Sequence, residues 1–265
     1  MITIQTLIVV ALSSEWPILR RRYRFTKPLP DLPLFIYHTQ NKSCANAKNN
    51  DFKVAVLQIG MGSEKAKSTL QQFFKTHQAQ HIFHFGLSGA LGADLPVESL
   101  FLPSQICNHN GQTVAVTLPS AISINRQPTG DLTPRASANN IRSIRASNLT
   151  GRLLTVSMPL VTVVEKKMAA KATGAIAVDM ESFAVATFCH EQKVSYTSCR
   201  GIIDSHNEAI TVFANTQTPT GHTRFWRLAA NILRQPTAIS LLLKFAKRHA
   251  RLQKYFLECV QDYFD

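Results

Sequence analysis

The chain has 265 residues, 45% of them hydrophobic, and a formal net charge of +13 at pH 7. This length suffices for one large α/β domain or two small ones, and the absence of a linker rich in proline, glycine and serine favours one. No apolar segment is long enough to span a bilayer. The five scattered cysteines, none in a Cys-x-x-Cys pair, argue against a disulfide framework and favour reduced thiols in the cytoplasm.

The first half of the chain alternates short apolar runs with turn and helix signals. The runs predict strands over residues 4–10, 34–37, 53–58, 81–85, 100–107 and 113–116. Ser13 or Ser14 is expected to cap a short helix that carries Glu15, and Ser63 to cap an amphipathic helix that reaches about His77. The strand over 81–85 is expected to end in a glycine-rich segment, residues 86–89.

The second half continues the same alternation. A loop over 120–134 and a polar helix over 136–146 are followed by predicted strands over 153–157, 175–178 and 194–199. Helices are predicted around 165–172 and over 183–189, and two basic helical runs follow residue 222. Strands alternate with helices almost throughout. The fold class expected is therefore α/β, a single domain with a mixed, mostly parallel sheet flanked by helices and a C-terminal helical extension.

Two acidic groups stand at the ends of neighbouring predicted strands. The segment Ala177-Val178-Asp179-Met180-Glu181-Ser182 places Glu181 at a strand-to-helix junction, and Arg200-Gly201-Ile202-Ile203-Asp204 places Asp204 just beyond the next strand. Because α/β proteins place ligand groups at such ends, the two carboxylates can converge on one small ligand. On pattern alone, helix capping by Asp179 and a turn at Asp204 remain open as alternatives.

These segments resemble the purine nucleoside phosphorylase and methylthioadenosine/adenosylhomocysteine nucleosidase superfamily. The resemblance covers residues 4–207 and includes Ala11-Leu12-Ser13-Ser14-Glu15, Gly60-Met61-Gly62 and Phe85-Gly86-Leu87-Ser88-Gly89-Ala90-Leu91. Thr173-Gly174-Ala175 before the acidic segment, with the basic tail, is most similar to the hopanoid-associated branch, whose members are thought to release adenine from adenosylhopane. The resemblance implies a nucleoside phosphorylase-type domain over 1–221 and a basic helical extension over 222–265, packed on the same domain.

The resemblance also implies roles for individual residues. Asp204 would serve the purine N7, and Glu15 would lie near the water that attacks C1′ of the sugar. Glu181 would hold the ribose hydroxyls, with Met180 packing on the sugar. Gly86 and Leu160 would complete the substrate-binding set. No metal and no cofactor is implied.

Carboxyl groups suit this chemistry. When an N-glycosidic bond breaks, the sugar gains oxocarbenium character and the leaving base gains negative charge. A protonated carboxyl at N7 neutralises the base, and that role needs a raised pKa. A second carboxylate can orient the water and stabilise the cationic sugar, and a third can accept hydrogen bonds from a cis-diol. The function expected is release of adenine from an adenosine-type nucleoside, with a hopanoid lipid on the 5′ carbon as one option.

Two departures from the family favour water over phosphate as the nucleophile. Phosphorylases of the family often place an arginine before the glycine segment and a serine or threonine within it, where this chain has His84 and Leu87. They also tend to have a Gly/Arg phosphate site in the opening loop, where this chain has Glu15. Arg20, Arg21 and Arg22 can still supply positive charge. A phosphate-dependent purine nucleoside phosphorylase therefore remains the first alternative. The second alternative is a non-catalytic nucleoside-binding or membrane-associated protein of the same fold.

Other motifs have simpler interpretations. Glu15 can be a first-turn helix carboxylate, which the resemblance makes less favoured than a catalytic role. His77, His81 and His84 do not form a plausible metal site, because His77 is expected to end a helix and the other two to point to opposite faces of a strand. Gly60-x-Gly62 lacks the third glycine of a dinucleotide fingerprint.

The charge is concentrated near the C-terminus. Residues 209–257 contain no Asp or Glu. The same stretch contains Arg224, Arg227, Arg234, Lys244, Lys247, Arg248, Arg251 and Lys254. Such a stretch is most often a solvated helix face, but it also suits an anionic membrane surface. The partners expected are a small purine nucleoside, an anionic membrane surface and further copies of the chain in a homo-oligomer, with no nucleic acid. The localisation expected is cytoplasmic, with a peripheral position on the inner membrane as an option.

Overall fold

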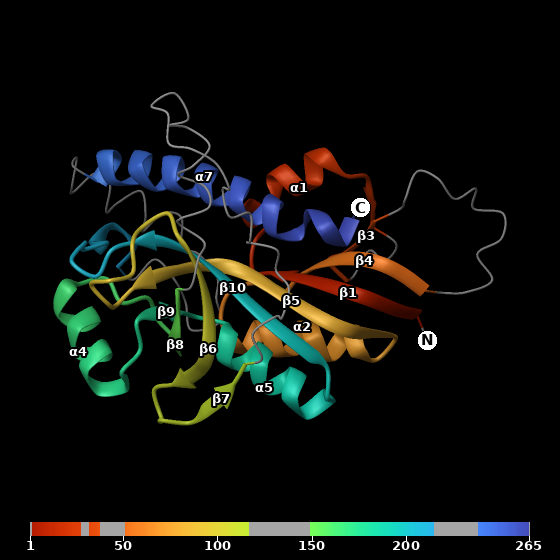
Figure 1. Ribbon diagram of the computed structural model, residues 1–265, viewed down its shortest axis with the longest axis horizontal. Coiled ribbons are helices and arrows are strands. Elements are labelled where there is room, and N and C mark those ends of the chain that lie inside the picture. The colour runs from red at the N-terminus through yellow and green to blue at the C-terminus, as the bar shows by residue number, and fades with distance from the viewer. Residues whose placement is uncertain (1, 28–31, 38–50, 117–148, 215–237, 265) are drawn as a thin grey trace, which may run out of the picture.

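A ten-stranded mixed sheet forms the centre of the computed structural model, which describes residues 2–27, 32–37, 51–116, 149–214 and 238–264 (Figure 1). The strands are β1 (Ile2–Val10), β2 (Phe25–Thr26), β3 (Leu34–Tyr37), β4 (Asp51–Gln58), β5 (His77–Ala90), β6 (Leu100–Asn108), β7 (Thr113–Ala115), β8 (Thr150–Thr155), β9 (Ala177–Asp179) and β10 (Ser195–Asp204). They follow the order β10-β6-β8-β9-β5-β1-β4-β3-β2, with β7 paired to β6. Because β5 also pairs with β10, the strands from β10 to β5 close into a ring.

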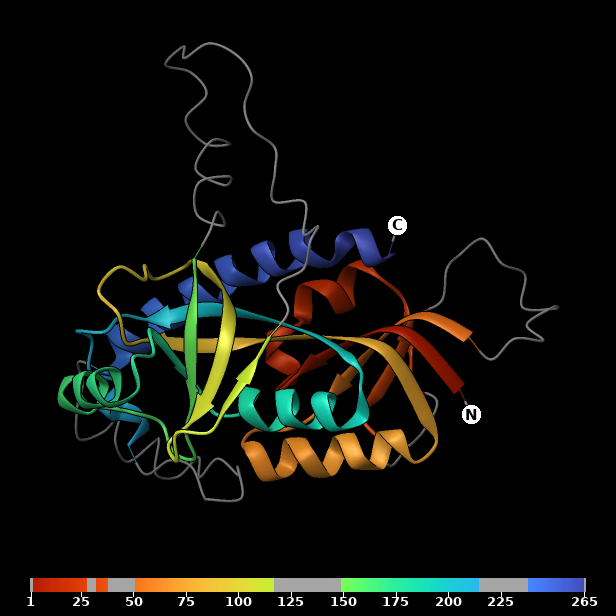
Figure 2. The ribbon, with the colours of Figure 1, turned by 60° about the horizontal axis from the view of Figure 1, so that its bottom comes forward.

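Helices cover both faces of this sheet. They are α1 (Pro17–Arg22), α2 (Ser63–Phe74), α4 (Val163–Thr173), α5 (Ser182–Gln192) and α7 (Ala238–Phe264), with the short 3-10 helices η1 (Ser13–Glu15) and η3 (Thr211–Phe213). In both views α7 and α1 lie over one face, and α2 and α5 lie over the other (Figures 1 and 2). The expected α/β class with a mixed sheet, flanking helices and a C-terminal helix is confirmed.

Four central strands run parallel and are buried on both faces. β1 pairs in parallel with β4 and β5, and β5 pairs in parallel with β10. The second half of β1, from Thr6 to Val10, is buried without a break, and all of it except Thr6 is apolar. Such strands are continuous apolar runs because both faces are covered, which is why this segment is recognisable in the sequence.

Helix α7 completes the core on its face of the sheet. Phe256 of α7 stacks on Phe85 of β5 with ring centroids 3.9 Å apart, and Leu252 and Val260 are fully buried beside it. Further along α7, Phe264 stacks on Tyr23 at 4.2 Å. The second half of the long C-terminal helix is therefore packed into the fold. The division at residue 221 into a domain and an extension stays a prediction.

Three sequence-based predictions around α2 and β5 are wrong. β5 begins at His77, where the sequence pattern predicts the end of a helix, and it runs through the glycine-rich segment to Ala90. Gly86 and Gly89 have no positive φ, so they continue the strand rather than turn it. Ser63 does not cap α2, since Gly62 is the N-cap and the Ser63 hydroxyl donates to the Met180 carbonyl at 3.1 Å.

Several expectations lie outside the described residues, among them the loop over 120–134, the polar helix over 136–146 and the basic run before Pro236. Within the described residues, the second basic run is helical as expected and forms α7. No helix in the described part of the chain is both long and apolar enough to cross a membrane.

Candidate active site

A cleft of about 230 Å³ opens where β1, β5, β9 and β10 end. It contains most of the substrate-contacting residues expected from the sequence. They are Glu15, Leu160, Met180, Glu181 and Asp204. Gly86 does not line the cleft. The ends of neighbouring parallel strands meet at one edge of a sheet, so residues far apart in sequence converge there.

Glu15 is held at the cleft by backbone donors. Its side chain is 5% exposed, and its Oε2 accepts hydrogen bonds from the backbone N–H groups of Ala11 at 2.7 Å and Leu12 at 3.0 Å. Its Oε1 accepts from the Leu87 N–H at 3.3 Å. Burial raises the pKa of Glu15, although these donors and the nearby charge of Arg200 oppose the rise. Glu15 therefore occupies one fixed orientation.

Glu181 lies across the cleft at the N-terminus of α5. Its Oε1 accepts a hydrogen bond from the Gly62 N–H at 2.8 Å, which ties the acidic segment to the glycine turn before α2. Burial, reinforced by the charge of Asp179, raises the pKa of Glu181 to about 8. Gly62 has a φ of 84°, so this turn favours glycine at that position.

Asp204 is the last residue of β10 rather than a residue beyond it, and it is only 3% exposed. It pairs with Gly89 of β5 across a register shift that begins after Ile202. A Cβ on Gly89 would lie 2.9 Å from Asp204 Oδ2. The glycine therefore makes room for the carboxyl group. The alternative of a turn at Asp204 is wrong, because Asp204 lies within a strand that carries a register shift.

Lys166 of α4 is the ion-pair partner of Asp204. Its ammonium donates to Asp204 Oδ2, and it also donates to the carbonyls of Ser205 and Glu208 at 2.8 Å each. Thr162 and Glu165 form a capping box that starts α4 directly before Lys166. Burial raises the pKa of Asp204, and the Lys166 ammonium opposes the rise.

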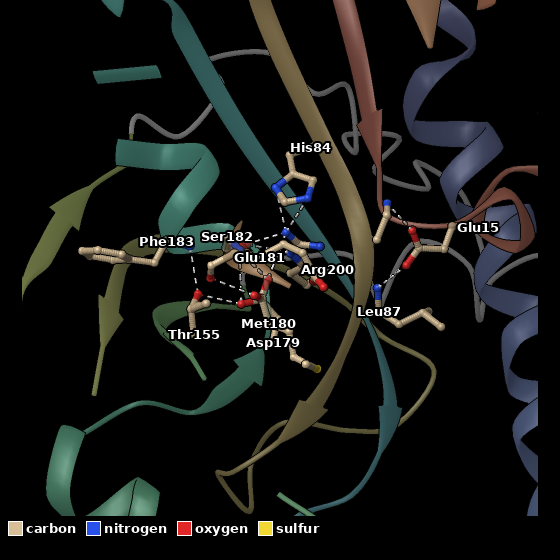
Figure 3. Close-up of polar contacts among 12 residues, drawn as sticks. Glu15, His84, Leu87, Thr155, Asp179, Met180, Glu181, Ser182, Phe183 and Arg200 are labelled. Atoms are coloured by element: carbon tan, nitrogen blue, oxygen red, sulfur yellow. Dashed lines mark hydrogen bonds and ion pairs between the residues drawn. The ribbon is translucent and has the colours of Figure 1, made fainter. Parts of the chain in front are cut away.

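A second buried cation lies behind the cleft (Figure 3). Arg200 is 1% exposed, donates from Nε to Ser182 Oγ at 3.0 Å and forms an ion pair with Asp179 at 3.1 Å. A Cβ on Gly86 would collide with its guanidinium group, so Gly86 makes room for Arg200 as Gly89 does for Asp204. Asp179 also accepts from the Ser182 N–H at 3.1 Å, but the N-cap residue of α5 is Glu181, so the alternative of a cap at Asp179 is wrong.

The remaining walls of the cleft are mainly apolar. Ile210, Phe213 and Phe245 line it on the side of α7, and the rings of Phe213 and Phe245 stack at 5.6 Å. Ser88 also lines it, and its buried hydroxyl has no hydrogen-bond partner among the described residues. A buried hydroxyl without a protein partner is suited to a polar ligand atom.

The sequence matches the model of a known protein family. Residues 6–234 match the model described as the Phosphorylase superfamily. The chain belongs to the Phosphorylase superfamily. No curated protein matches its sequence.

Solved structures of other proteins share the superfamily fold. A mutant MTAN of Helicobacter pylori, with 5′-methylthioadenosine in its active site, is 16% identical, with 97% of this chain and 98% of that one covered at a TM-score of 0.60. A 5′-methylthioadenosine nucleosidase of Arabidopsis thaliana is 16% identical, with 99% and 96% covered at 0.58. A futalosine hydrolase mutant of H. pylori is 17% identical, with 99% and 100% covered at 0.58. At these identities the likeness establishes the fold alone.

Several residues of this superfamily member's cleft are not predicted from the sequence, among them Lys166, Ser88 and Phe245. Lys166 lies in a helix with several other lysines, and only its complete burial distinguishes it. Ser88 lies in a glycine-rich segment whose pattern is typical of a turn. Phe245 lies in the basic run, whose many charges predict a solvent-exposed helix rather than a helix that lines a cleft. A capping box followed by lysine is the only local signal for Lys166.

The histidines make separate contacts. His77 Nδ1 lies 2.8 Å from Thr76 Oγ1, and His81 Nε2 lies 3.0 Å from Thr197 Oγ1. His84 is fully buried against Arg200, and burial together with that positive charge holds its pKa well below the usual range. His84 is therefore neutral and does not line the cleft.

Proposed function

We propose that this protein cleaves the N-glycosidic bond of an adenosine-type nucleoside and uses water as the nucleophile. The observation that carries the proposal is the presence in one small cleft of three buried carboxyl groups with raised pKa values, those of Glu15, Glu181 and Asp204. A fourth buried carboxylate of the lining, that of Asp179, is paired with Arg200. Buried carboxyl groups with raised pKa values are typical of sites that move protons.

Each carboxyl group has a distinct role in the proposed reaction. Asp204 donates a proton to N7 of the purine as the bond between C1′ and N9 breaks, and the electron pair of that bond goes to the base. Glu15 orients a water molecule and accepts its proton as the oxygen attacks C1′. Glu181 binds the ribose hydroxyls through its carboxyl oxygens, and Met180 packs on the sugar.

The charges near Glu15 support water over phosphate. A phosphate dianion beside the Glu15 carboxylate would be repelled, and His84 is neutral and buried away from the cleft. Arg20, Arg21 and Arg22 are exposed on α1 and do not line the cleft. Arg200 supplies positive charge near Glu15, but its Nε and Nη2 atoms are already bound to Ser182, His84 and Asp179.

The test is adenine release from adenosine and 5′-methylthioadenosine, with and without inorganic phosphate. We expect adenine release at the same rate in both buffers, with the free sugar as the second product. A sugar 1-phosphate as the main product would contradict hydrolysis and support the phosphorylase alternative. Tight nucleoside binding without any cleavage would support the non-catalytic alternative.

The 5′ substituent of the proposed substrate is apolar. Ile210, Phe213 and Phe245 form a continuous apolar wall that reaches from the cleft to the first half of α7. Beyond it, the side chains of Ile239 and Leu243 on α7 are 53% and 60% exposed. An apolar group on the 5′ carbon, such as a hopanoid lipid, would gain from contact with this wall because apolar area is removed from water.

The same half of α7 supports the proposed membrane surface. Lys244, Lys247 and Lys254 are exposed on the helix that carries Ile239 and Leu243. Basic side chains beside exposed apolar ones suit an anionic bilayer, where each charge contributes about 1 kcal/mol. Arg248 and Arg251 are less available, because they bind Glu208 at 2.6 Å and Glu98 at 2.7 Å.

We therefore expect the protein to co-sediment with phosphatidylglycerol vesicles at low salt and to be released by salt, since exposed charges are screened within about 10 Å. Changing Lys244, Lys247 and Lys254 together to Glu should abolish this binding and leave hydrolysis of soluble adenosine unchanged. The matched control changes Lys65, Lys67 and Lys75 to Glu on and beside α2, on the opposite face of the sheet. Equal loss in both variants would mean that net charge, not α7, governs binding.

A further inference from the structure

Lys166 is enclosed by acceptors of its own chain. Its side chain is 1% exposed, and its ammonium contacts the Asp204 carboxylate and the carbonyls of Ser205 and Glu208. An ammonium has three N–H groups, so all of its donors are used. It also lines the cleft beside Asp204. A lysine so completely enclosed and so close to the proposed acid belongs to the reacting centre.

The contact with Lys166 opposes the proposed role of Asp204 as a general acid acting alone. A carboxyl group must carry a proton before it can donate one to N7, but an adjacent ammonium favours the ionised carboxylate. Burial raises the pKa of Asp204 and the Lys166 ammonium opposes the rise, so we treat the two groups in contact as one coupled pair with one proton to transfer. The Lys166 ammonium, rather than the Asp204 carboxyl group, is therefore the better source of the proton for the leaving base.

We propose that Lys166 supplies, through Asp204, the proton that the purine N7 receives. The proposal rests on the proposed N-glycosidic cleavage. Lys166 acts only through Asp204, so it is a positioning and proton-supplying residue.

The Lys166 ammonium gives a proton to the Asp204 carboxylate and becomes a neutral amine. As the C1′–N9 bond breaks, its electron pair goes to the purine, and N7 takes that proton from Asp204, which is again a carboxylate. Water adds its oxygen to C1′ and gives its proton to Glu15. After adenine and the sugar leave, Glu15 loses that proton to solvent and Lys166 gains one from solvent, which restores the starting state.

Two other charged groups near the pair, Glu208 and Arg248, have opposite effects on the pKa of Asp204. Glu208 lies on the segment after β10 and raises the pKa of Asp204. Arg248 of α7 opposes it, donating to Glu208 Oε2 at 2.6 Å and to the Ile203 carbonyl at 3.0 Å. Lys166 comes from α4 and Gly89 of β5 carries no charge. Lys166 is therefore the charged group in direct contact with Asp204 among the described residues.

The test is the pH profile of kcat/KM for adenine release by wild type and by Lys166→Met. The two proton sources differ widely in water, because a free lysine ammonium titrates near pH ~10.4 and a free aspartic acid near pH ~3.9. In Lys166→Met, Asp204 alone holds the proton. We expect the alkaline limb to move toward acid by more than about one pH unit, with activity within about tenfold of wild type at the acidic end.

A purely structural role for Lys166 would give a different profile. Activity would then fall by the same factor at every pH, with the alkaline limb unmoved, and that outcome overturns the proposal. Lys167→Met is the matched control, because Lys167 is the exposed neighbour on α4. Its profile should equal that of the wild type.

Lys166→Arg gives an independent answer if the methionine variant does not fold. Arginine keeps the positive charge beside Asp204 but does not release its proton in a protein. We expect at least about 100-fold lower kcat/KM across the pH range. Wild-type activity in Lys166→Arg would overturn the proposal. If wild type releases adenine and Asp204→Asn does not, the proposed function stands whatever the Lys166 variants do.

Discussion

Asp204→Asn is expected to lower turnover on purine nucleosides by about 100-fold or more while the fold is kept. The amide has the shape of the carboxyl group and its oxygen can still accept from Lys166, but it cannot deliver a proton to N7. Steady-state adenine release, with thermal unfolding as the check on the fold, measures both parts of this prediction.

Asp94→Asn is the control for this substitution. Asp94 is exposed in the segment between β5 and β6, so the same chemical change there should leave turnover unchanged. A folded Asp204→Asn protein that turned over at the wild-type rate would remove Asp204 from the mechanism and Lys166 with it.

Arg200→Met is expected to destabilise the protein by about 3–5 kcal/mol. The substitution leaves Asp179 buried without its cation, and removing one member of a buried ion pair costs more than the pair itself contributes. It also removes the donors to Ser182 and His84. The midpoint of urea unfolding should fall accordingly, with its slope unchanged.

Arg251→Met is the matched substitution in an exposed ion pair. Arg251 binds Glu98 at 2.7 Å, but its side chain is 60% exposed, so its loss should move the midpoint of urea unfolding far less than Arg200→Met does. Equal destabilisation by the two substitutions would mean that the Arg200 network contributes no more than a surface contact.

The apolar strands and the fold class can be predicted from the sequence alone. The pattern predicts β3 with its observed bounds, and β1, β4 and α4 to within a few residues, because each is a continuous apolar run or a helix with a capping box. The pattern predicts too short a β5, because Gly86 and Gly89 are typical of a turn. Glycine is needed at these positions because the side chains of Arg200 and Asp204 on the neighbouring strand lie against them. No local pattern reveals which side chain a glycine must accommodate.

The candidate site is predictable in part for the same reason. Glu15, Glu181 and Asp204 lie at the ends of elements that the sequence marks clearly, so their convergence follows from the α/β class and the family resemblance. The partner of Asp204 lies 38 residues away on α4. Pairing of that kind depends on how a helix rotates against the sheet, which single-sequence periodicity does not define.

The packing of α7 has a consequence for the order in which the chain folds during synthesis. Gln253 donates to the Glu15 carbonyl, and Phe256 and Phe264 cover rings of β5 and of the segment after α1. Before α7 leaves the ribosome, only α1 covers this face of the nascent sheet, and the Glu15 segment lacks this support. A chain stalled ahead of residue 238 should therefore expose Phe83 and Phe85 to chaperones, and its cleft should be assembled only after translation of the helix is complete.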